Sequence, residues 1–161
     1  LGLAADIIGD ILTHSTFAPE ELERERGVIL QEIGQANDTP DDIIFDHFQA
    51  TAFPDQPMGR PTLGTEEVIK GMKREALTGY MRHHYGPGGM VVAAAGALDH
   101  DHVLDLVQTH FAGLPAVAPD AAHGARYGGG EFREERDLDQ VHIVLGFPGT
   151  AYRDPLHYPT L

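Results

Sequence analysis

The sequence predicts an α+β fold in which helices pack on one face of a mainly antiparallel sheet. Helical periodicity runs through most of residues 1–84 and returns at 99–111. Residues 88–96 are continuously small and apolar and are bounded by glycine, which is typical of a buried strand. Two further segments indicate strands. Residues 130–138 are polar, as expected at a sheet edge, and residues 141–147 are mostly apolar, as expected of a strand buried on at least one face.

The predicted helices rest on start signals and apolar stripes. Pro19 and Pro40 suit the first helical position, because the amide hydrogen that proline lacks would have no partner there. Thr39 and Asp99 can each cap a helix through a side-chain oxygen. The helices are predicted at 1–14, 19–37, 40–52, a short stretch after Thr65, 73–84 and 99–111, with a loop rich in proline and glycine at 53–64.

A change in composition predicts the domain organisation. Residues 116–130 shift to proline, alanine and glycine, which is typical of a linker. We therefore place one domain at 1–115 and the first strands of a second domain at 131–161. The chain shows no internal repeat, since only a short part of the second unit is present.

Charge and composition exclude several classes of partner. The 161 residues carry a formal net charge of −14, which argues against nucleic acid and against an anionic membrane surface. No apolar run reaches the length that spans a membrane. The acidity is compatible with basic peptide substrates, but on charge alone we interpret it as an aid to solubility. The absence of cysteine excludes disulfides and thiolate metal sites. It does not identify a compartment, and our expectation is a cytoplasmic location.

Glu25 and Glu32 are the candidate site residues. They lie seven positions apart in a helical segment, so both carboxylates project from nearly the same face. That face also carries Leu22, Val28 and Ile33, which predicts that the carboxylates are partly buried. A buried carboxylate needs a metal ion or a cationic side chain as partner. A rise of about 1.5 Å per residue separates the two Cα atoms by roughly 10 Å, too far for both side chains to bind one zinc comfortably.

Five stretches of the chain resemble, in order, the zinc peptidases of the pitrilysin, insulinase and mitochondrial-processing-peptidase family. They are FAPEELERERGVILQEI (17–33), DIIFDH (42–47), QPMGRPTLG (56–64), HHYGPGGMVVAAAG (83–96) and DQVHIVLGFP (139–148). The resemblance implies that residues 1–115 are the C-terminal part of a first peptidase domain. Residues 131–161 would then open a second domain that repeats the first domain's fold.

The resemblance also implies a function and roles for the two glutamates. It implies a Zn²⁺-dependent metalloendopeptidase that hydrolyses peptides or presequences, in which an inverted motif, H-x-x-E-H, supplies two zinc ligands and the general base. Glu32 matches the later glutamate that completes the zinc site. Glu25 matches a glutamate that supports the site from its outer sphere. The implied partners are a peptide or unfolded polypeptide substrate and a homologous domain or subunit that completes a clamshell.

The chain departs from the family because none of its ten histidines belongs to an H-x-x-E-H motif. It therefore contains no catalytic residue of its own, and by itself it should be inactive. One explanation is that the chain is an internal fragment of an active protein. The other is a non-catalytic partner subunit that binds extended peptide, and the presence of Glu32 favours the first. The pair His100–His102 is interpreted as the polar start of a helix, because no third ligand is evident. The pair His83–His84 is interpreted as the end of a helix, where cations complement the dipole.

Overall fold

The computed structural model describes residues 1–117, 120 and 124–160 of the chain. The chain divides into two compact units. Unit 1 comprises residues 1–26 and 71–122, and unit 2 comprises residues 27–70 and 123–161. No helix in the described part of the chain is both long and apolar enough to cross a membrane.

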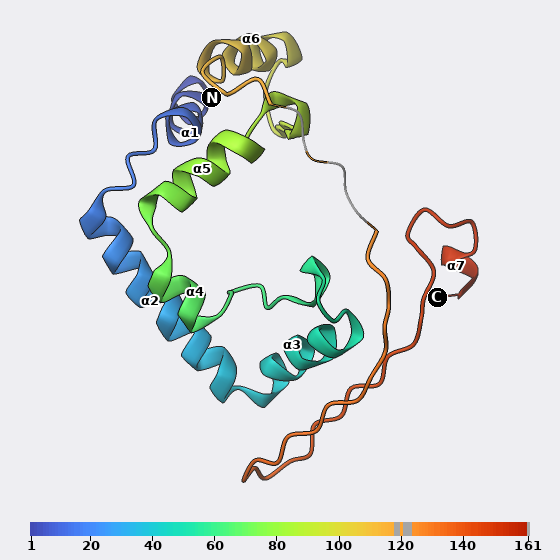
Figure 1. Ribbon diagram of the computed structural model, residues 1–161. Helices are drawn as coiled ribbons and strands as arrows, with labels where there is room; N and C mark the ends of the chain where they lie inside the picture. The colour runs from blue at the N-terminus through green and yellow to red at the C-terminus, as the bar shows by residue number, and fades with distance from the viewer. Residues whose placement is uncertain (118–119, 121–123, 161) are drawn as a thin grey trace. The chain divides into compact units, whose positions relative to one another are not determined.

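The helices lie close to where the sequence predicts them (Figure 1). Their bounds are α1 Gly2–His14, α2 Pro19–Asp38, α3 Pro40–Ala52, η1 Pro57–Gly59, α4 Glu66–Gly71, α5 Arg74–His84, η2 Pro87–Gly89, α6 His100–His110 and α7 His157–Thr160. The Asp99 side chain caps α6 by accepting a hydrogen bond from the His102 amide at 2.9 Å. Thr65 Oγ1 accepts from the Val68 amide at 3.3 Å at the start of α4. Thr39 precedes α3 as predicted, but its hydroxyl donates back to the Gln35 carbonyl instead of capping α3.

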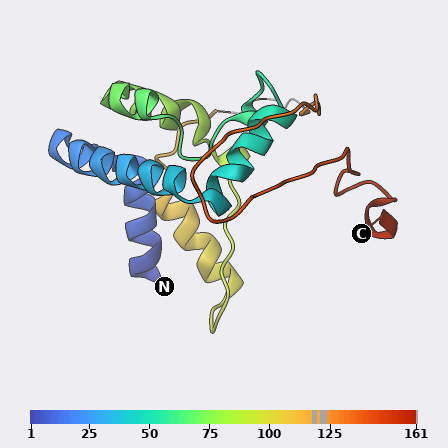
Figure 2. The same ribbon diagram turned by 90° about the horizontal axis from the view of Figure 1, so that it is seen from below.

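Unit 1 is organised around the pairing of α1 with α6, which lie side by side in Figures 1 and 2. His110, in the last turn of α6, places Nδ1 3.2 Å from Asp6 of α1. Arg74, the first residue of α5, donates from Nε to the Thr16 carbonyl at 3.1 Å. These contacts tie both ends of the unit's sequence together, so residues 1–26 and 71–117 form one body.

The predicted sheet is not found, and the α+β fold class is wrong for this structure. The described residues contain no strand, and the structure is 54% helical. Residues 88–96 form η2 and then irregular chain in which Val91 is 93% exposed. Residues 130–138 and 141–147 are likewise irregular, and Val141 is 86% exposed. A strand is defined by hydrogen bonds to a neighbouring strand, and no described segment provides that ladder here.

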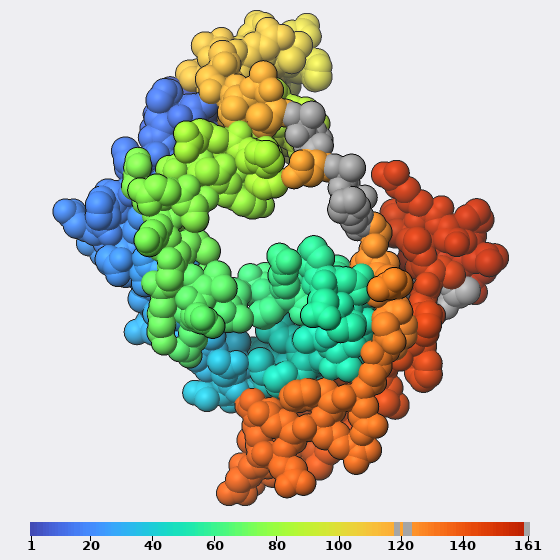
Figure 3. Space-filling model, viewed as in Figure 1, coloured from blue at the N-terminus to red at the C-terminus, as the bar shows by residue number. Residues whose placement is uncertain are grey.

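In unit 2, two extended segments run past α3. We call residues 128–136 the first extended segment and residues 138–146 the second extended segment. The space-filling view in Figure 3 shows chain from this region packed directly against α3. The predicted domain limits at 115 and 131 stay a prediction, and part of the predicted linker, residues 118–119 and 121–123, lies outside the described residues.

The cap of α6 gives a first testable expectation. Replacing Asp99 with alanine removes the only side-chain acceptor for the His102 amide that the structure shows, so the isolated chain should lose about 1 kcal/mol of unfolding free energy. Asp105, inside the same helix, serves as the matched control, because alanine is the better helix former at an interior position. Urea unfolding followed by circular dichroism measures both variants. Equal midpoints for Asp99→Ala and Asp105→Ala would contradict the capping role.

Candidate functional site

The two candidate glutamates share helix α2, as predicted, but they are not buried. Glu25 and Glu32 are both exposed, and neither makes a hydrogen bond or an ion pair with a described residue. The neighbouring apolar residue Ile33 is buried, at 7% exposure. The expectation of partly buried carboxylates is therefore wrong for the described structure, in which both side chains are exposed.

The described residues do not assemble a complete metal site. No group of three or more histidine, aspartate or glutamate side chains is close enough to hold a metal ion in the described ranges. His83 Nε2 lies 3.9 Å from Asp120 and both side chains are exposed, so this contact is a weak surface ion pair. Structural and catalytic zinc sites need at least three protein ligands. Glu32 alone does not satisfy that requirement, and no step of a reaction can be derived through zinc from these residues.

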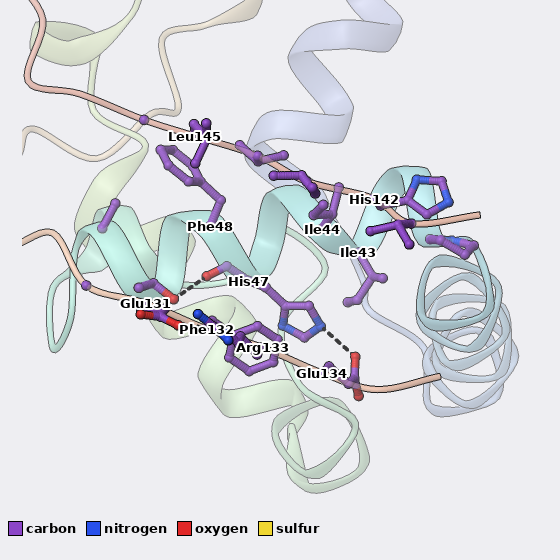
Figure 4. Close-up of a pocket in the computed structure, with 18 of the residues that line it drawn as sticks. Ile43, Ile44, His47, Phe48, Glu131, Phe132, Arg133, Glu134, His142 and Leu145 are labelled. Carbon is purple, nitrogen blue, oxygen red and sulfur yellow. Dashed lines mark hydrogen bonds and ion pairs between the residues drawn. The ribbon is translucent and has the colours of Figure 1, made fainter. Parts of the chain in front are cut away.

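A groove in unit 2 has a volume of about 1070 Å³. Figure 4 shows α3 between the two extended segments, with Ile43, Ile44, His47 and Phe48 directed from the helix toward them. The lining mixes apolar residues with charged side chains from the first extended segment. The groove is therefore amphipathic, and α3 contributes much of its apolar lining.

Contacts along the C-terminal half of α3 hold the first extended segment. At one end, the Gly128 amide donates to the Ala52 carbonyl at 2.7 Å. Gly130 has φ 147°, and a Cβ there would meet the Thr51 side chain at 2.8 Å, so both its conformation and the close approach require glycine. Further along, the rings of His47 and Phe132 stack with centroids 4.2 Å apart. The segment thus follows α3 from its C-terminus toward its N-terminus.

The second extended segment returns along α3 in the opposite direction. His142 Nδ1 lies 2.9 Å from Asp41 near the start of α3. Gly146 approaches the Phe48 ring so closely that a Cβ would collide with it, and the Gly146 carbonyl accepts a hydrogen bond from Tyr127 Oη at 3.0 Å. Every second residue from 141 onward is exposed. These residues are Val141, Ile143 and Leu145 of the segment, and Phe147 directly after it. The alternation is that of a strand, although the segment has no strand partner among the described residues.

Glu134 lies close to Arg136 and His47 in the groove. Glu134 Oε2 lies 2.8 Å from Arg136 Nε and 3.4 Å from His47 Nε2. The hydrogen bond from Arg136 is the main cause that lowers the pKa of Glu134, and together with the charges of Arg136 and His47 it outweighs the opposing effect of desolvation. Glu134 therefore stays ionised at neutral pH, and its contact with Arg136 weakens only as the pH falls through this lowered pKa.

Sequence reasoning missed the His47, Glu134 and Arg136 cluster. One signal was present: His47 lies on the apolar stripe of α3 with Ile43, Ile44 and Phe48, where a polar residue needs a partner. Its partner comes from a segment that is remote in sequence, so periodicity alone cannot identify it. The cluster offers ion pairing and ring stacking, but it has no nucleophile and no set of metal ligands in the described residues.

Comparison with known families covers nearly the whole chain. Residues 71–161 match the family described as peptidase M16 inactive domain, and residues 1–66 match insulinase (peptidase family M16). Similar proteins include an uncharacterized zinc protease of Rickettsia felis, 36% identical over 92% of this chain and 36% of that protein. A probable mitochondrial-processing peptidase subunit beta of Arabidopsis thaliana is 36% identical over 94% of this chain and 30% of that protein. The chain thus spans about a third of the length of these relatives.

Solved structures show a similar fold. The crystal structure of a peptidase M16 inactive domain from Pseudomonas fluorescens matches with a TM-score of 0.68 at 18% identity, over 74% of this chain and 29% of that one. A chain of complex III2 from Candida albicans matches with a TM-score of 0.61 at 21% identity, over 81% of this chain and 31% of that one. Since the inactive-domain family alone matches more than half of the residues, the resemblance found in the sequence is confirmed: the chain belongs to the M16 family of metallopeptidases.

Proposed function

We propose that the chain is part of a zinc-dependent metalloendopeptidase that hydrolyses peptides or presequences. The observation that carries this proposal is the match to proteins named zinc protease, at 36–37% identity over 92–96% of the chain. That match includes most of the chain, and the insulinase match covers the helix that bears Glu25 and Glu32. A peptide or unfolded polypeptide is the proposed substrate, and a homologous domain or subunit is the proposed partner that completes a clamshell around it.

Within that enzyme, Glu32 is proposed as a zinc ligand and Glu25 as a residue of the outer sphere. Both carboxylates are exposed and unpaired in the described structure, so their oxygens are available to an added ligand or neighbouring element. An anionic oxygen ligand suits zinc. The described residues supply this single candidate ligand, and the remaining ligands and the general base are assigned to no residue of this chain.

A non-catalytic partner subunit is the second candidate function. It is favoured by one observation, the match of residues 71–161 to the family described as inactive domain. The two candidates differ in one simple property of the full-length protein. The enzyme contains an H-x-x-E-H motif and loses peptide hydrolysis when zinc is chelated, whereas the partner subunit lacks the motif and hydrolyses nothing by itself.

Zinc binding by the 161-residue chain tests the proposal directly. We expect a dissociation constant weaker than micromolar and no peptide hydrolysis, because one carboxylate cannot replace a three-ligand site. Titration calorimetry with zinc chloride measures the binding, with the Glu32→Gln chain as control. The full-length protein should instead hold one zinc per molecule by atomic absorption. Micromolar or tighter binding by the chain would redirect the assignment to its histidine pairs.

A further inference from the structure

We propose that residues 141–147 dock a second copy of this chain, and that the two copies pair there as antiparallel strands about a two-fold axis centred on Val144. We call these residues the pairing segment; they comprise the end of the second extended segment and Phe147. The proposal goes beyond the proposed function and involves neither zinc nor catalysis. It concerns unit 2, to which the pairing segment and α3 both belong.

The backbone of the pairing segment has the free hydrogen-bonding groups that a partner strand requires. Among the described residues, no backbone–backbone hydrogen bond joins it to another segment. The Gly146 carbonyl accepts a hydrogen bond from the Tyr127 side chain, and the other carbonyls and amides of the segment have no such partner in the described structure. An extended segment with unpaired amides and carbonyls is a template for pairing with another chain.

The side chains of the pairing segment present an apolar face to solvent. Its four odd-numbered residues, from Val141 to Phe147, are 74–86% exposed. The three residues between them are half-buried. Single exposed apolar residues are ordinary, but a contiguous exposed patch marks an interaction site.

Contacts with α3 prevent the segment from turning this face inward. His142 Nδ1 lies 2.9 Å from Asp41, and Gly146 lies so close to the Phe48 ring that no side chain fits between them. Both contacts use the even-numbered face of the segment. Rotation of the segment about its own axis would bury the odd-numbered face only by breaking both contacts. Covering that face therefore requires another segment.

The order of residues about Val144 makes the pairing segment complementary to itself. In the two-fold pair, Val141 lies opposite Phe147 of the second copy, and Ile143 lies opposite Leu145 of the second copy. All four side chains are on the outward face. Aromatic, β-branched and aliphatic side chains that face each other across two strands stabilise an antiparallel pair. Because both copies use the same residues, the pair closes on itself as a dimer.

Charge selects a second copy over a basic peptide as the occupant. The pairing segment contains no acidic residue, and its one ionisable side chain, His142, is placed opposite Gly146 in the two-fold pair. A basic peptide would find no opposite charge within the segment. The first extended segment instead carries acidic and basic side chains at residues 131 and 133–136, and charges of this kind protect a strand edge from pairing.

Residues 90–96 are a second uncharged apolar stretch and serve as the comparison. Residues 91–96 are all exposed, so neither face of this stretch is held against the protein. More than half of the stretch is alanine and glycine, which strands disfavour, whereas the pairing segment has three β-branched residues. The pairing segment is therefore the better strand former.

Sedimentation equilibrium of the 161-residue chain tests the association. A pair of seven-residue strands is smaller than a standard interface, so we expect a weak dimer that forms over a range of roughly 10–500 µM. The net charge of −14 makes the copies repel each other, and salt screens that repulsion. Association should therefore strengthen from about 0.1 M to about 1 M sodium chloride. A chain that stays monomeric throughout, or an association that salt weakens, would overturn the proposal.

Leu145→Lys and Val91→Lys form a matched pair of variants. Each replaces an exposed apolar residue of irregular chain and changes the net charge equally, but only Leu145 lies in the pairing segment. Leu145→Lys should weaken association by about tenfold, because both symmetric contacts between residues 143 and 145 are lost. Val91→Lys should leave association unchanged.

Two outcomes of this comparison would overturn the proposal. One is unchanged association in Leu145→Lys, and the other is a loss of association in Val91→Lys alone, which would place the docking surface at residues 90–96. Circular dichroism checks that each variant folds. If Leu145→Lys does not fold, Phe147→Lys makes the same test on the same face.

Disulfide trapping tests the register of the pair, since the chain contains no cysteine. The two-fold axis brings residue 144 opposite its own copy, with Cα atoms about 4.5–5.5 Å apart, which a disulfide can span. The two copies of residue 145 are offset along the strands by two residues, which places their Cα atoms roughly 8 Å apart. With oxidised glutathione, Val144→Cys should form a covalent dimer about tenfold faster than Leu145→Cys, although residue 145 is the more exposed. Equal or faster cross-linking of Leu145→Cys would contradict the pairing about Val144.

Discussion

Replacing Glu32 by glutamine in the full-length protein is expected to abolish zinc retention and peptide hydrolysis together. Glutamine keeps the size and helix propensity of glutamate but removes the anionic charge of the proposed zinc ligand. Atomic absorption and a fluorogenic peptide assay measure the two losses. Both should exceed the roughly 10- to 100-fold effect of changing an outer-sphere residue. Circular dichroism should be unchanged, since Glu32 is exposed and makes no described contact.

Two variants on the same helix control this experiment. Glu25→Gln should reduce metal affinity or turnover only within the outer-sphere range, because Glu25 lies too far from Glu32 to bind the same zinc comfortably. Glu20→Gln, in the first turn of α2, should leave zinc and turnover unchanged. A Glu32→Gln protein with full zinc and normal turnover would place the third ligand elsewhere. If Glu25→Gln proved the more damaging change, the two roles would be reversed.

Ile33→Ala should be the most destabilising single substitution on α2. Ile33 is 7% exposed and lines a small cavity with Ile43 and Leu63 in unit 2. Truncation of a buried isoleucine typically costs about 2–5 kcal/mol of unfolding free energy. Because the hollow beside Ile33 leaves its side chain fewer contacts to lose, the expected loss is near the lower end of this range, at about 2–3 kcal/mol. Urea unfolding monitored by circular dichroism measures it in the 161-residue chain.

Val28→Ala is the matched control for Ile33→Ala. Val28 lies on the same helix but is 42% exposed, so its truncation removes little buried apolar surface. Alanine is the better helix former, and this gain in helix propensity nearly cancels the small loss of burial. Its unfolding midpoint should stay close to that of the unmodified chain. Equal destabilisation by Val28→Ala and Ile33→Ala would show that Ile33 is not a centre of packing in unit 2.

Sequence reasoning identified the candidate ligand but not its surroundings. The seven-residue spacing placed Glu25 and Glu32 on one helix, which the structure confirms, and the resemblance to the M16 family is confirmed by the comparisons. The assignment of Glu32 to zinc and of Glu25 to its outer sphere stays a prediction. The apolar stripe wrongly predicted partial burial of both carboxylates, because a stripe shows which face is apolar and not whether another element covers it.

The helices were determined by the sequence itself, because helical hydrogen bonds and caps join residues only a few positions apart. Pro19 begins α2, Pro40 begins α3 and Asp99 caps α6, as predicted. The strands could not be determined in this way. Residues 88–96 and 141–147 have strand-like composition, yet a strand forms only where another segment completes its hydrogen-bond ladder, and the described residues offer none.

Only the tertiary structure decided which distant residues meet. It brings His47 to Glu134, and it brings Arg136 to Asn37 across 99 positions of the sequence. Composition and periodicity report on neighbours within a few turns of helix, so they give no information about such pairs. The physical reason is that these contacts follow from the path of the first extended segment along α3, which glycines at 128 and 130 allow to approach the helix closely.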